Sequence, residues 1–67
     1  MRTLSKRTTM AVNKYGADNC IKAANMYAEN RNGAAAIADE LIGEWDTNKG
    51  NALINSGNEL LKSGFSL

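Results

Sequence analysis

Apolar side chains recur along this chain every three or four residues, which is the spacing of an α-helix that buries one face. The pattern predicts four helical segments, over residues 4–15, 17–31, 34–45 and 47–63. Strict alternation of apolar and polar residues is nearly absent and β-branched residues are few, so strands are not expected. We therefore predict an all-α fold, a small bundle of three main helices plus an N-terminal helix or basic arm.

The segments over residues 17–31 and 34–45 have the clearest apolar stripes. The first stripe consists of Ala17, Cys20, Ile21, Ala24, Tyr27 and Ala28, and the second of Ala34, Ile37, Ala38, Leu41 and Trp45. These stripes predict burial for Trp45, Tyr27 and the Cys20 thiol. Burial in the core is likewise expected for Tyr15, Met10 and Met26, since methionine often fills gaps between larger side chains.

Residues that favour helix ends separate these segments. They are Ser5 or Thr3 at the first start, Gly16 at the first end, Asn32 and Gly33 after the second segment, Asp46 to Asn48 before the last, and Gly64 as its stop. Gly43 weakens the last turn of the third segment. Phe65 and Leu67 are then expected to fold back onto the bundle.

Glycine returns every seven residues in the last segment, at Gly50, Gly57 and Gly64. Leu53 and Leu60 follow three positions later, so these residues share one helix face and are expected to form a helix-packing stripe. Glycine inside a helix costs about 0.5–1 kcal/mol relative to alanine. Glycine at these positions would allow a second, alanine-rich helix to approach closely. Two alternatives stay open: the glycines divide the segment into two short helices, or they form a homodimer seam.

Charge is unevenly distributed, although the net charge is +1. Residues 1–16 form a basic N-terminal segment with four basic residues and no acid, whereas acids outnumber bases over residues 39–67. Such a separation produces a field that steers charged partners. Basic side chains also oppose the dipole at a helix start, so fraying is expected there.

The composition excludes several kinds of chemistry. The chain has no histidine and one cysteine, which rules out histidine-based catalysis, an internal disulfide and a multi-thiolate metal site. The acidic residues near position 40 are typical of a solvated helix face, and no glycine-rich phosphate loop has the required spacing. We predict no enzymatic activity, no catalytic residue, no cofactor and no metal.

The 67 residues are expected to form one domain, residues 1–67. No apolar run approaches the roughly 18 residues of a membrane span, and no apolar region follows the basic start as in a secretory signal. A single cysteine suits a reducing compartment. We therefore expect a cytoplasmic protein with no membrane partner.

Residues 35–41 resemble the first helix of a helix-turn-helix motif, in which a glycine would follow Leu41 directly. Here Ile42 stands at that position and Gly43 comes one residue late. The following segment offers asparagines that can read adenine edges, but its one basic residue before position 59 is Lys49. Since phosphate contacts need clustered basic residues, the N-terminal segment is the better candidate for binding nucleic acid.

The leading functional hypothesis is a small non-enzymatic regulator or inhibitor that occupies a surface of a larger partner protein. Phage and mobile-element genomes are rich in chains of this size, so such an origin is our guess. The candidate partner-binding residues are Arg2, Lys6, Arg7, Lys14, Glu40, Glu44 and Trp45. The alternatives are a nucleic-acid-binding regulator that uses the basic segment and a degenerate helix-turn-helix, and a homo-oligomeric assembly protein.

Overall fold

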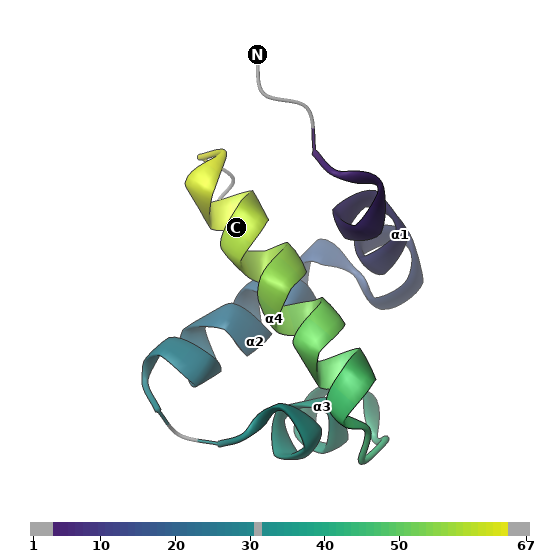
Figure 1. The fold of residues 1–67 in the computed structure, drawn as a ribbon, viewed down its shortest axis with the longest axis vertical. Helices are drawn as coiled ribbons and strands as arrows, with labels where there is room; N and C mark the ends of the chain where they lie inside the picture. Colours follow the sequence, from purple (N-terminus) through teal and green to yellow (C-terminus); the bar gives the residue numbers. More distant parts are fainter. Residues whose placement is uncertain (1–3, 31, 65–67) are drawn as a thin grey trace.

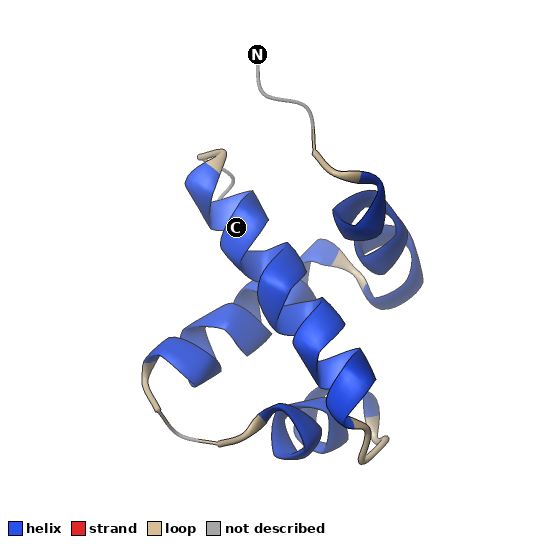
Figure 2. Cartoon of the chain, viewed as in Figure 1, coloured by secondary structure: helices blue, strands red, loops and turns tan. Residues whose placement is uncertain are grey.

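The computed structural model describes residues 4–30 and 32–64, and the regular secondary structure within them is entirely α-helical (Figure 2). The four helices are α1 (Lys6–Tyr15), α2 (Ala17–Ala28), α3 (Ala34–Ile42) and α4 (Thr47–Lys62). The predicted all-α bundle is thus confirmed. The basic N-terminal segment contributes a helix of its own, α1, to the packed structure.

Helix α4 is the longest element and organises the bundle. It crosses the middle of the molecule, with α2 behind it, α1 along one side and α3 near its N-terminal end (Figure 1). Each of the other three helices contacts α4, and α2 also contacts α1 and α3. Because α4 touches every other helix, its residues decide how closely the bundle packs.

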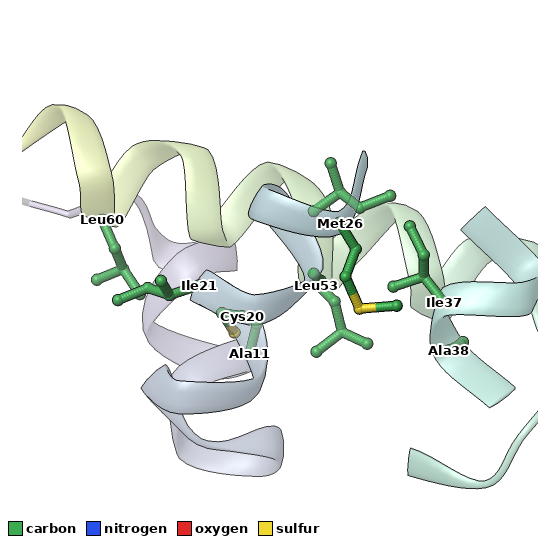
Figure 3. Close-up of a cluster of buried hydrophobic side chains, with 10 residues drawn as sticks. Ala11, Cys20, Ile21, Met26, Ile37, Ala38, Leu53 and Leu60 are labelled. Carbon is green, nitrogen blue, oxygen red and sulfur yellow. The ribbon is translucent and has the colours of Figure 1, made fainter. Parts of the chain in front are cut away.

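The core lies where α2 and α3 pack against α4 (Figure 3). Its largest fully buried side chains are Ile37, Leu53, Leu60 and Cys20. Burying a leucine or isoleucine side chain contributes about 1.5–3 kcal/mol. Helix α1 adds Ala11, the one apolar side chain of that helix that is fully buried, together with partly buried neighbours.

Gly50 and Gly57 lie at the two closest helix contacts. A Cβ atom placed on Gly50 would come within 1.9 Å of the Ala34 carbonyl oxygen, and one on Gly57 within 1.9 Å of the Cys20 carbonyl oxygen. Real Cβ atoms do not approach backbone this closely, so α3 and α2 can reach α4 because both positions lack a side chain. Both glycines lie inside one continuous helix, which rules out the division into two short helices.

Gly64 does not belong to this packing stripe. It is exposed, no atom of the residues that the structure describes lies within 4 Å of a Cβ placed on it, and its φ is +85°. That conformation favours glycine and lets the chain leave the helix after Ser63, the C-cap of α4. The assignment of Gly64 to helix packing is therefore wrong, whereas its assignment as the stop of the helix agrees with the structure.

Two helices end three residues earlier than predicted. Helix α2 stops at Ala28, and Asn30 takes a left-handed conformation with φ of +61°. Helix α3 stops at Ile42 because Gly43, in the left-handed region with φ of +71°, caps it. Trp45 consequently lies beyond the helix whose stripe it was predicted to extend.

Three residues that were predicted to lie in the core are exposed. Trp45, Met10 and Tyr27 are 72%, 60% and 53% exposed, so the predictions that they are buried are wrong. Cys20 and Met26 are buried as predicted, and Tyr15 packs half-buried against the core. Phe65 and Leu67 lie outside the described residues.

Candidate binding groove between α1 and α4

An open groove with a volume of about 810 Å³ lies between α1 and α4. One wall is a stripe of α1 that includes Arg7, Met10 and Lys14, at helical spacing of three and four residues. The other wall is an exposed face of α4. We call this feature the α1/α4 groove.

The α4 wall carries three asparagines, Asn48, Asn51 and Asn55, which we call the asparagine row. All three are exposed, and within the described ranges 4–30 and 32–64 their side-chain amides form no hydrogen bond. Asn19 differs, because its amide donates to the Tyr15 carbonyl oxygen at 2.9 Å. The asparagine row therefore presents donors and acceptors that are free to bind a ligand.

Glu59 lines the groove and joins α4 to the start of α1. The Ser5 backbone N–H donates to Glu59 Oε1, and the Thr8 hydroxyl donates to Oε2 at 3.0 Å. Helix α1 has no acid in its own first turn, where a negative charge is favourable. A carboxylate 54 positions away in the sequence supplies that charge.

The Ser5 side chain completes this network as the N-cap of α1. Its Oγ accepts from the Thr8 backbone N–H at 3.2 Å and donates to the Thr8 hydroxyl oxygen at 3.1 Å. Thr8 is 2% exposed, so its hydroxyl would be costly to bury without these partners. The network holds the α1 wall in place and opposes fraying of its basic first turn.

The basic side chains of the groove differ from Lys22 and Lys49, which are paired with acids. Arg7 and Lys14 form no ion pair with any residue that the structure describes, and Lys14 Nζ lies 5.4 Å from the centre of the Tyr15 ring. Lys22, in contrast, pairs with Asp18 at 3.1 Å, and Lys49 pairs with Glu44. The groove thus holds cations available to an acidic partner.

The structure brings two of the seven predicted partner-binding residues, Arg7 and Lys14, into this groove. Lys6 is exposed on α1 but does not line the groove, and Arg2 lies outside the described residues. The other three, Glu40, Glu44 and Trp45, lie on α3 and the turn that follows it.

One of these residues, Glu44, is held in place by its ion pair with Lys49. The hydrogen bond from Lys49 to Glu44 raises the pKa of this exposed lysine, and the negative charge of Glu44 adds to the effect. A carboxylate already paired with a lysine is less available to a partner. Glu44 therefore closes the turn between α3 and α4, which weakens its candidacy as a binding residue.

Reasoning from the sequence did not identify the asparagine row or Met10 as parts of one site. The spacing of Asn48, Asn51 and Asn55 by three and four residues indicates a common helix face. The position of α1 beside this face of α4 depends on the contacts of Ser5 and Thr8 with Glu59, which lies far away in the sequence. No local pattern contains that information.

Cys20 is fully buried, and burial raises the pKa of its thiol. A protonated, inaccessible thiol is a poor nucleophile, as expected for a core residue. Among the described residues, no three side chains of histidine, cysteine, aspartate or glutamate gather closely enough to hold a metal ion. No helix in the described part of the chain has both the length and the apolar character needed to span a membrane.

Comparisons of this chain with protein-family models, with curated proteins and with solved structures give no match.

Proposed function

We propose that this chain is a small, non-enzymatic binding protein that holds a segment of a larger partner protein in the α1/α4 groove. The observation that carries the proposal is the combination, along one groove, of exposed amides, cations without an ion pair among the described residues and the exposed Met10 side chain. Groups of this kind give orientation, charge selection and apolar contact to a bound segment. By occupying a surface of its partner, the protein would act as a regulator or inhibitor in the cytoplasm.

Trp45 offers a second contact outside the groove. It immediately precedes Asp46, the N-cap of α4, and lies three positions before Asn48. A tryptophan that is 72% exposed is unusual, and tryptophan is enriched among the residues that dominate binding energy at interfaces. This position supports its earlier candidacy as an aromatic anchor.

The two alternative functions have less support. Nucleic-acid binding would need several free cations on one face, yet Lys22 and Lys49 are paired with acids. Oligomerisation through the glycine face would need that face to be free. Gly50 and Gly57 are instead covered by Ala34 and Cys20 of their own chain.

Capture of the partner from native host lysate tests the proposal. Immobilised wild-type protein is compared with the double variant Arg7→Glu/Lys14→Glu, in which both groove cations are reversed. The charge-matched control is Lys6→Glu/Lys62→Glu, which changes exposed lysines outside the groove. We expect the control, but not the groove variant, to retain the captured protein. Equal capture by both variants would overturn the assignment to the groove.

A further inference from the structure

We infer that the occupant of the α1/α4 groove is an extended peptide segment with acidic side chains, whose backbone is held by the asparagine row. This inference rests on the function proposed above and specifies the chemistry of the partner. It is argued from the spacing of the asparagines, from the chemistry of the amide group and from the charges on the opposite wall.

The spacing of the asparagine row fits an extended backbone. Successive residues of an α-helix rise by about 1.5 Å, so Asn51 and Asn55 are about 6 Å apart along α4, and Asn48 and Asn55 about 10.5 Å. Two residues of an extended strand cover about 6.6 Å, and residues two positions apart direct their backbone groups to the same side. The amides of Asn51 and Asn55 can therefore reach the peptide groups that such a pair of residues directs to one side of an extended segment.

The amide side chain has the hydrogen-bonding groups that a peptide backbone needs. Each asparagine offers one acceptor oxygen and two donor hydrogens, which complement the N–H and C=O of a single residue. These groups are unpaired in an extended segment, whereas a helix already satisfies its own backbone groups internally. The asparagine row thus discriminates in favour of an extended segment over a helical one.

The α1 wall of the groove selects the side chains of the bound segment. Arg7 and Lys14 are seven residues apart, or about 10.5 Å along α1, which equals the span of the asparagine row. Carboxylates that project from an extended segment toward α1 would lie beside these two unpaired cations. Met10, 60% exposed between them, offers an apolar contact. Basic side chains would be repelled along the same wall.

Selection from a display library of random twelve-residue peptides tests the inference on the full chain. The wild-type protein serves as bait, and the variant Asn51→Leu/Asn55→Leu is used only afterwards, in affinity measurements with the enriched peptides. The enriched peptides are expected to contain acidic residues at alternate positions. Synthetic copies should bind the wild type at least about tenfold more tightly than the variant, since two amides lose their hydrogen bonds to the peptide backbone. Methylation of the central backbone nitrogens should weaken binding similarly.

Asn58→Leu is the matched control, because Asn58 is exposed on α4 but does not line the groove. It should leave peptide affinity unchanged, and circular dichroism should show the same helix content for both asparagine variants. Groove-dependent peptides that bind as helices, carry no acid, or tolerate Asn51→Leu/Asn55→Leu would overturn this inference and leave the proposed function standing. Failure to enrich any peptide, or selective binding of a poly-dT oligonucleotide in the groove, would overturn both.

Discussion

Glycine performs two distinct tasks in this protein, and its surroundings decide which. Gly50 and Gly57 have ordinary helical conformations, and their lack of a side chain admits the backbone of a neighbouring helix. Gly16, Gly43 and Gly64 have positive φ values and open space around them, so they serve the ends of helices. The same substitution to alanine therefore strains the helix contact at the first two positions and the backbone conformation at the other three.

Replacing Gly57 by alanine should destabilise the protein, although alanine is the better helix former. The new methyl group would lie 1.9 Å from the Cys20 carbonyl oxygen, so α2 and α4 must move apart. We expect a loss of about 1–3 kcal/mol in the free energy of unfolding, as for other overpacked cores, measured by urea denaturation. Gly33→Ala is the control, because Gly33 has negative φ and open space. A Gly57→Ala protein as stable as the wild type would contradict the close contact.

The Cys20 thiol should react slowly with an aromatic disulfide reagent at neutral pH. It is fully buried and its pKa is raised by burial, so reaction requires opening of the fold. We expect the native protein to react at least about 100-fold more slowly than the urea-unfolded chain, since each 1.4 kcal/mol of opening free energy is tenfold. Native and unfolded rates that coincide would place the thiol at the surface.

The same thiol makes stability fall at alkaline pH. Its pKa is higher in the folded protein than in the unfolded chain, so the unfolded chain loses the proton first. The contribution of Cys20 to the free energy of unfolding is complete below the ordinary thiol pKa. It is lost as the pH rises through the raised pKa of the folded protein. Cys20→Ala should flatten this part of the stability profile, whereas an unchanged profile would assign the loss to other groups.

At the scale of helices, the sequence predicts which segments are helical better than it predicts where they end. The apolar period sets each helix, and Ser5 and Asp46 act as N-caps where capping residues were expected. The end of α3 was missed because Gly43 adopts a left-handed conformation before the apolar pattern stops. The end of α2 was missed because Asn30 adopts one ahead of the stop signal that Asn32 and Gly33 provide in the sequence. Because the apolar pattern continues past Gly43 to Trp45, the sequence wrongly predicts that Trp45 is buried.

The Thr8–Glu59 hydrogen bond should couple α1 to α4. Thr8→Val removes the buried donor without changing the side-chain shape, and a bond to a charged group is worth about 1.5–3 kcal/mol. We expect Thr8→Val and Glu59→Gln each to lower stability by about 1–2 kcal/mol. The double variant should lose less than the sum, which a double-mutant cycle by urea denaturation measures.

Amide hydrogen exchange provides the local readout for these variants. Loss of the bond should accelerate exchange in α1 more than in α4, since α1 contributes one fully buried apolar side chain to the core. Thr9→Val is the control on the same helix: Thr9 is exposed, and its hydroxyl donates within α1 to the Ser5 carbonyl oxygen. Additive effects in the cycle, or equal acceleration in all helices, would argue against the coupling.

At the scale of the whole molecule, the close approach of helices at Gly50 and Gly57 and the formation of the α1/α4 groove have different origins. The glycine spacing indicates the buried face of α4 from sequence alone, because its partners are alanine-rich helices of the same chain. The α1/α4 groove arises from the polar contacts of Glu59 with Ser5 and Thr8, and these residues lack any shared local pattern. For this reason the sequence indicated Arg7 and Lys14 as partner-binding candidates and the asparagines as possible readers of adenine edges, but not that these residues face each other across one groove.

The distribution of free charge argues that this protein will not retain nucleic acid at physiological salt. Of the cations in the described part of the chain, Lys22 and Lys49 are paired, and two of the unpaired ones, Arg7 and Lys14, lie together in the groove. Two phosphate contacts would give a slope of log K against log salt of about −2, far shallower than that of proteins with six to ten contacts. Fluorescence anisotropy with labelled duplex DNA and single-stranded RNA should show binding that is weak at low salt and absent at physiological salt. A slope steeper than about −5 would require more phosphate contacts than the groove cations supply and would favour the nucleic-acid alternative.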